Sequence, residues 1–128
     1  MQKDVSESVF RFLSKHHIRQ ASEFDAVFKQ GKRIVADCFA FYFIKTERDY
    51  PRLGMVISKR NCALAVNRNR IKRVIREQFR LNQHLISTVD LVVTLKSPLK
   101  KMSDEEQGEC IKKLFSQLTT YCDGSLSN

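Results

Sequence analysis

The chain has 128 residues, a formal net charge of +9 and 42% hydrophobic residues, nine of them Phe. This length fits one domain that can bury a sizeable core. No apolar run approaches the ~20 residues of a membrane-spanning helix, and the N-terminus lacks the apolar segment of a secretory signal. We therefore expect a cytoplasmic protein rather than a membrane or secreted one.

The N-terminal residues 1–20 are expected to form a basic, extended lead-in. Its adjacent His16 and His17 are interpreted as solvated side chains rather than as acid–base catalysts. A short helix is predicted over residues 22–30, with Ser22 as its N-cap and acidic residues in its first turn.

Residues 33–38, 39–45 and 52–58 are rich in β-branched and aromatic side chains, which predicts three strands. In the second of them the three Phe alternate onto one face, which is typical of a core face. Tyr42 lies on the other face.

Most of the excess positive charge lies in residues 59–80. This segment carries eight Lys or Arg against a single acid, Glu77, a net charge of +7. The other 106 residues carry 15 basic against 13 acidic side chains. Such a concentration is typical of a surface that binds a polyanion, most often nucleic acid. The alternative is a solvated basic face that only keeps the protein soluble.

The absence of Pro and Gly from residues 65–82 predicts a helix around this charge. At helical spacing the basic row consists of Arg68, Lys72, Arg76 and Arg80, with Asn69 and Arg73 beside it. The opposite, apolar face consists of Ile71, Val74, Ile75 and Gln78, with Phe79 at its edge. Like charges at this spacing repel one another, so a bound anion would stabilise the helix.

The C-terminal third adds one strand and one helix. Residues 90–95 are an apolar run typical of a buried strand, and Ser103-x-x-Glu106 is a capping box that opens the last helix. The resulting order, α-β-β-β-α-β-α, predicts a single α+β domain over residues 21–122, with a four-stranded sheet packed by helices. Residues 123–128 are expected to be a frayed tail.

The sequence contains no motif for catalysis or metal binding. The four Cys are far apart and are expected to be reduced, and the three His have no metal-ligand spacing with them. No carboxylates have two-metal spacing, and no Gly-rich phosphate loop is present. We therefore expect no catalytic residue and no metal site in this polypeptide.

Three aromatic residues leave two interpretations open. Phe24 and Phe28 share one face of the first helix, and Tyr42 lies on the non-core face of its strand. They can pack in the core, or they can stack on unpaired bases beside a basic surface, as in proteins that bind single strands.

The motifs Arg52-x-Gly54 and Ser58-Lys59-Arg60, followed by AVNRNRIKR at residues 65–73, resemble those of the protein subunit of bacterial ribonuclease P. The Arg-Asn-Arg block at 68–70 is the most recognisable motif of that family. The resemblance covers roughly residues 12–118. His17-Ile18 departs from it, because many members have Arg-Leu there.

The resemblance implies the small partner of a large catalytic RNA. Their holoenzyme hydrolyses a phosphodiester to remove the 5′ leader from precursor tRNA, using Mg²⁺ held by the RNA. The protein is implied to be monomeric, with one copy per RNA, and to have a left-handed β-α-β crossover through the basic helix.

The resemblance also implies roles for individual residues. Contact with the catalytic RNA is implied for Arg60, Arg68, Asn69, Arg70, Lys72, Arg73, Arg76 and Arg80. A groove between the sheet and the basic helix is implied to hold the single-stranded leader, lined by Phe24, Phe28, Tyr42 and Lys59. Two alternatives are an RNA-binding module of ribosomal or RNA-chaperone type with no role in tRNA processing, and a nuclease that needs no RNA partner.

Overall fold

The computed structural model describes residues 14–86, 88–99 and 102–122. Its elements are the 3-10 turn η1 (Ser14–His16), α2 (Ala21–Gln30), β1 (Lys32–Ala36), β2 (Phe39–Lys45), β3 (Arg52–Val56), α3 (Ala65–Ile86), β4 (Val89–Leu95) and α4 (Asp104–Cys122). The predicted α+β class and the predicted order of helices and strands are confirmed.

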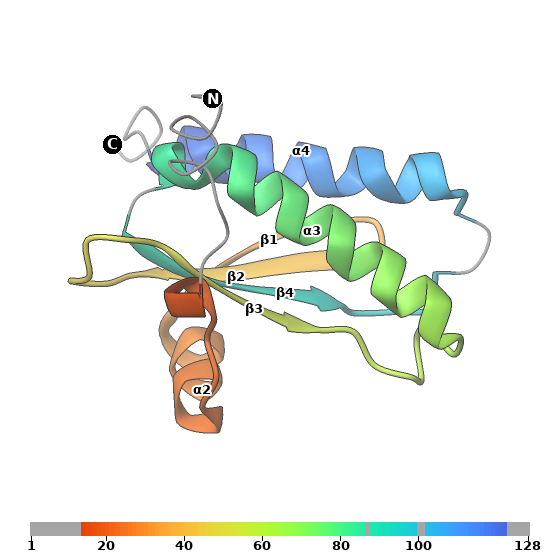
Figure 1. Cartoon of the computed structure of the whole chain (residues 1–128), viewed down its shortest axis with the longest axis horizontal. Coiled ribbons are helices and arrows are strands. Elements are labelled where there is room, and N and C mark those ends of the chain that lie inside the picture. The colour runs from red at the N-terminus through yellow and green to blue at the C-terminus, as the bar shows by residue number, and fades with distance from the viewer. Residues whose placement is uncertain (1–13, 87, 100–101, 123–128) are drawn as a thin grey trace, which may run out of the picture.

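The four strands form one mixed sheet in the order β1-β2-β4-β3. β2 pairs antiparallel with both β1 and β4, whereas β3 and β4 are parallel neighbours. Parallel neighbours need a crossover connection, and α3 supplies it. In Figure 1 α3 lies above the sheet and β4 lies behind β3, so the crossover is left-handed, against the usual rule.

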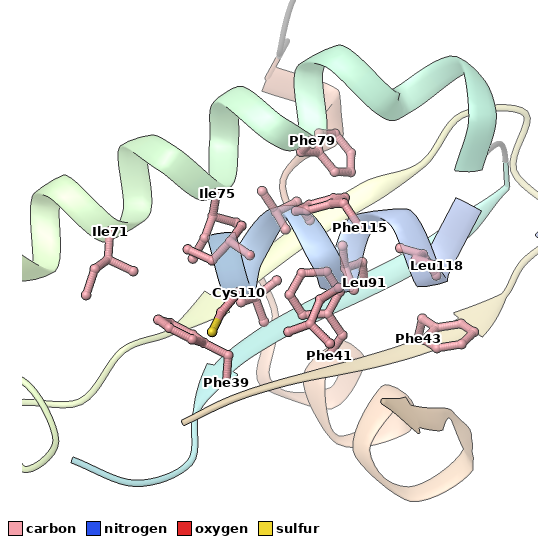
Figure 2. Packing of buried hydrophobic residues seen from close by; sticks show 14 of the residues in the cluster. Phe39, Phe41, Phe43, Ile71, Ile75, Phe79, Leu91, Cys110, Phe115 and Leu118 are labelled. Carbon is pink, nitrogen blue, oxygen red and sulfur yellow. The ribbon is translucent and has the colours of Figure 1, made fainter. Parts of the chain in front are cut away.

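The main core lies between the sheet and the helix pair α3 and α4 (Figure 2). The three Phe of β2 point into it, as predicted, and Phe41 meets Phe115 of α4 edge to face at 4.9 Å. From α3, Ile71, Ile75 and Phe79 are fully buried. The apolar face of α3 is therefore centred on Ile75 and Phe79, whereas Val74 and Gln78 are only half-buried.

A smaller core lies on the opposite face of the sheet, where α2 covers one end (Figure 1). Val27 of α2 and Ile18 pack on Val92 of β4. Gly54 of β3 lies directly under the Phe24 ring, because a Cβ there would stand 2.5 Å from a ring carbon.

Several boundaries differ from the sequence prediction. The N-cap of α2 is Gln20, whose backbone N–H donates to the Glu23 carboxylate at 3.4 Å, so Ser22 is inside the helix. Asp37 has a positive φ of 53° and forms a turn with Cys38, so the first strand ends at Ala36. Asp tolerates this backbone conformation better than most residues.

The capping box at the start of α4 is confirmed. The backbone N–H of Ser103 donates to the Glu106 carboxylate at 2.8 Å, and the backbone N–H of Glu106 donates to Ser103 Oγ at 3.1 Å. These two bonds satisfy donors that a helix N-terminus otherwise leaves unpaired.

The end of the N-terminal lead-in docks on the sheet. The backbone N–H of Ile18 donates to the Leu53 carbonyl at 2.9 Å, next to a bridge between His17 and Leu53. His16 is buried between the rings of Tyr50 and Phe79, so the prediction that it is solvated was wrong. The reason is that β3 is an edge strand, whose free backbone groups can pair with this segment. Residues 1–13 and the tail 123–128 lie outside the described residues.

The four Cys are free thiols, with Cys62 and Cys110 buried and the other two half-buried. Burial, together with a hydrogen bond to Asp37, raises the pKa of Cys110 to about 12. The burial of Cys62 and Cys110 is thus observed, whereas the reduced state of the four Cys stays a prediction.

Candidate nucleic-acid interface

The basic helix α3 presents different residues on each of its sides. The predicted row of Arg68, Lys72, Arg76 and Arg80 is half-buried along one flank. The docked lead-in lies against α3 where the rings of His16 and Phe79 meet at 6.0 Å. Burial lowers the pKa of His17 there, and the charges of Arg19 and Arg76 lower it further. The outermost side carries the exposed Asn69, Arg73 and Glu77.

Arg68 has a structural role at the start of α3. Its Nη1 donates to the backbone carbonyls of Cys62 and Ala63, at 2.9 and 2.8 Å. These bonds fix the loop before α3 against the first turn of the helix. The same loop carries the exposed Lys59 and Arg60. We call the Lys and Arg side chains of residues 59–80 the basic surface. Arg68 therefore shapes this surface as well as adding charge to it.

Arg70 points toward α4 rather than outward. Its guanidinium donates to Asn67 and to Gln107, at 2.8 and 2.9 Å, and forms an ion pair with Asp104 at 3.0 Å. Arg80 is paired with Glu77 at 2.6 Å on the surface. Part of the charge repulsion expected within α3 is thus relieved inside the protein.

A buried ion-pair network fixes α2 against the sheet. Arg52 of β3 binds Asp90 of β4 through two hydrogen bonds of 3.0 and 2.8 Å, and it reaches Glu23 of α2 at 3.2 Å. Hydrogen bonding to Asp90 outweighs burial and raises the pKa of Arg52. Burial acts to raise the pKa of Glu23, but hydrogen bonds from the Gln20 backbone and Arg52 outweigh it and lower that pKa.

The network holds an aromatic cluster at the border of α2 and the sheet. The rings of Phe28 and Tyr42 meet edge to face at 4.9 Å, and the Arg33 guanidinium lies 5.7 Å from the Tyr42 ring. Phe28 keeps 38% of its surface exposed. Phe24 differs from Phe28, since its ring packs on Gly54.

The aromatic cluster continues into a part of the sheet beyond α2. Cross-strand register places Val35, Ala40, Thr94 and Val56 in one row over all four strands. Val35 and Val56 are 40% and 42% exposed. We call Arg33, Val35, Tyr42, Val56 and Thr94 the open sheet face.

Tyr42 packs with the small core under α2. Because α2 and α3 lie on opposite sides of the sheet (Figure 1), the open sheet face is on the side away from α3. The resemblance implies a groove between the sheet and the basic helix for the three aromatic residues. The structure instead places Phe24, Phe28 and Tyr42 on the other side of the sheet. The reason is the alternation of β2, which directs Tyr42 away from the face covered by α3 and α4. Lys59 lies apart from them, in the loop before α3.

Sequence reasoning did not identify Arg33 or the exposed valines. The alternation of β1 could have indicated Arg33, because it pairs with Tyr42 across the hairpin. The row that ends in Val56 could not be found this way, since it depends on the parallel pairing of β3 with β4.

The chain was compared with protein families and with known proteins. The family described as Ribonuclease P matches residues 12–119. The chain belongs to this family. It is 39% identical over 101 residues to the ribonuclease P protein component of Coxiella burnetii, covering 79% of this chain and 84% of that protein. The corresponding protein of Pseudoalteromonas translucida is 33% identical, covering 88% and 81%.

The fold agrees with this membership of the ribonuclease P protein family. The structure of the Staphylococcus aureus RNase P protein matches with a TM-score of 0.71 at 29% identity, covering 80% of this chain and 94% of that one. Within residues 14–86, 88–99 and 102–122, no three His, Cys, Asp or Glu side chains gather into a group that could hold a metal ion. No helix in that part of the chain is long and apolar enough to cross a membrane.

Proposed function

We propose that the chain is the protein subunit of a ribonuclease P ribonucleoprotein, which removes the 5′ leader from precursor tRNA. The observation that carries the proposal is the Arg-Asn-Arg block at residues 68–70, set in the basic surface of α3, in a chain of this family. Both RNAs in such a particle are polyanions, so a cationic surface between them lowers their repulsion. The Mg²⁺ concentration needed for cleavage falls accordingly.

The basic surface is proposed to bind the catalytic RNA. The contacting residues are proposed to be Arg60, Arg68, Asn69, Arg70, Lys72, Arg73, Arg76 and Arg80. Arg73 and Asn69 are exposed on the outer side of α3, which supports a direct contact for both. Guanidinium groups match phosphate oxygens with two parallel hydrogen bonds, and each neutralised phosphate releases counterions.

The open sheet face, together with Phe28, is proposed to bind the single-stranded leader. A half-exposed aromatic pair beside an arginine suits unpaired bases, which stack on rings with little dependence on sequence. Among the leader-binding residues inferred from the family, Phe28 and Tyr42 have rings that can stack on a base. The exposed Lys59 can contact a phosphate group of the leader. Phe24 is proposed to support them from beneath.

In this proposal the catalytic RNA performs the hydrolysis with Mg²⁺ that it holds itself. The protein positions the two RNAs and supplies no catalytic residue. It acts in the cytoplasm as a monomer, with one copy per RNA.

The test is reconstitution with a bacterial ribonuclease P RNA at low Mg²⁺. We expect the purified protein to increase cleavage of precursor tRNA and to bind leader-bearing tRNA more tightly than mature tRNA once assembled. No gain in cleavage would defeat the proposal. Tight RNA binding without leader preference would favour a general RNA-binding module, and cleavage without added RNA would indicate a nuclease.

A further inference from the structure

The side chain of Arg70 joins α3 to the start of α4. It is 27% exposed, and its two terminal nitrogens hold Asn67 on its own helix and both Gln107 and Asp104 on α4. Hydrogen bonds from an arginine to several acceptors fix its planar fork in one orientation. Arg70 is therefore already oriented before any RNA binds.

The three partners of Arg70 differ in how easily they can be replaced. Gln107 is only 5% exposed, and its Nε2 also donates to the Met102 carbonyl at 3.0 Å. Asn67 lies one helical turn from Arg70 on the same helix. Asp104 is 70% exposed, and an ion pair with so much access to water is weak. Asp104 is the exchangeable partner.

A cavity of about 390 Å³ adjoins this cluster. Its polar lining includes Asn61, Asn67, Arg70, Asp104 and Gln107. A water molecule occupies roughly 30 Å³ in the liquid, so the cavity has room for a phosphate group and several waters. Carboxylate and phosphate present similar paired oxygens to a guanidinium, so one can take the place of the other.

We propose that this cavity receives one backbone phosphate of the RNA, and that Asp104 holds Arg70 in place until this phosphate replaces it. The inference rests on the proposed function and deepens it. Asn67 and Gln107 keep the guanidinium oriented during the exchange, while the carboxylate of Asp104 moves into water. Asp104 thereby competes with RNA for Arg70 and lowers the affinity of the protein for RNA. In the free protein it helps to keep Arg70 in the orientation that binds phosphate.

The test compares Asp104→Asn with Glu105→Gln, in the full chain, by titration with ribonuclease P RNA at two salt concentrations. Both substitutions remove one negative charge from the first turn of α4, but only Asp104 contacts Arg70. We expect Asp104→Asn to bind RNA about two- to fivefold more tightly than Glu105→Gln, which corresponds to the loss of an exposed ion pair. The salt dependence of binding should also be steeper for Asp104→Asn.

A second pair of variants tests whether the gain acts through Arg70. With Arg70→Gln in the background, the difference between the two substitutions should vanish. If the Arg70→Gln protein does not fold, Arg70→Lys replaces it, since Lys keeps the positive charge but lacks the planar guanidinium. The difference in RNA affinity between Asp104→Asn and Glu105→Gln should be smaller in that background than in the wild-type background.

Equal gains from both substitutions would overturn the inference, because they would reflect net charge alone. A loss of affinity in Asp104→Asn would also overturn it, since Asp104 would then serve only to position Arg70. The wild-type protein in the same titration tests the proposed function separately. If it binds the RNA and increases cleavage but Asp104→Asn matches Glu105→Gln, only the inference fails.

Discussion

Phe28 differs from the core phenylalanines because water reaches 38% of its surface, whereas Phe39 and Phe41 are fully buried. Its ring is held against Tyr42 rather than enclosed. A residue in this position adds less to the free energy of unfolding than a fully buried phenylalanine, and the exposed part of its ring is available to a ligand. Phe28 is thus the best single test of the open sheet face.

We predict that Phe28→Ala reduces the preference of the reconstituted particle for leader-bearing over mature tRNA by about fivefold or more. Loss of one stacked base costs roughly 1–3 kcal/mol, and 1.4 kcal/mol is about tenfold in affinity. Binding curves with both tRNAs measure the preference. Thermal unfolding of the variant controls for folding, and a preference equal to that of wild type would contradict the stacking role.

At the scale of elements, the ion pairs of Arg52 connect β3, β4 and α2. Arg52 and Asp90 are only 8% and 5% exposed. A charge left unpaired at such a depth is strongly unfavourable. The position of the aromatic cluster therefore depends on this network.

We predict that Asp90→Ala lowers the free energy of unfolding by about 3 kcal/mol, the lower end for a broken buried pair, because Arg52 loses its buried partner and keeps only the partly exposed Glu23. Urea denaturation measures the change. Glu77→Gln, which breaks the exposed pair with Arg80, is the matched control and should cost less than about 1 kcal/mol. A loss in Asp90→Ala no larger than that of the control would contradict this role of Asp90, because Glu23 or water would then suffice for Arg52.

The docked lead-in gives the fold a pH dependence. Burial, with the nearby Lys15 and His17, lowers the pKa of His16 below its ordinary value of 6.5. The folded protein then binds fewer protons than the unfolded chain, so stability is full above pH 6.5 and decreases as the pH falls through that value. His17, whose pKa is also lowered, acts in the same direction.

We predict that wild-type protein loses stability to urea between about pH 7.5 and pH 5.5, and that His16→Gln loses less over the same interval. His84→Gln replaces an exposed histidine and should behave like wild type. If His16→Gln showed the full loss, the docked turn would not be the source of the pH dependence.

At the scale of the whole molecule, the two proposed surfaces lie on opposite sides of the sheet (Figure 1). α3 and α4 cover one side, and α2 with the open sheet face forms the other. The sheet between them carries a core of buried side chains on each face. One protein could therefore contact the catalytic RNA and the leader at the same time without either site disturbing the other.

We predict that Arg73→Ala and Phe28→Ala act independently. Arg73→Ala should weaken assembly with the RNA and reduce the salt slope by about 0.7–0.9, whereas Phe28→Ala should leave both unchanged. The double variant should show the sum of the two changes in binding free energy, as expected for sites without shared partners. Binding to the catalytic RNA and binding of the leader are measured separately for each variant. A clear departure of the double variant from the summed changes in binding free energy would contradict two separate surfaces.

Much of the fold could be predicted because its signals are local. The capping box at Ser103, the alternating Phe of β2 and the uninterrupted basic helix each depend on residues a few positions apart. These signals were sufficient for the order of elements and for the charge of α3. They also predicted that the three Phe of β2 face the core.

The partners of the charged and aromatic side chains were decided only by the tertiary structure. Arg70 binds Asp104 and Gln107, Phe28 meets Tyr42, and His16 is buried by Phe79. Each contact joins residues that are 14 or more positions apart, and its geometry depends on how helices and strands pack. The sequence by itself determined that α3 is cationic and that the Phe of β2 face the core, because both depend on residues a few positions apart. The side of the sheet that each aromatic faces, and which arginines already have partners, followed only from strand register and helix packing.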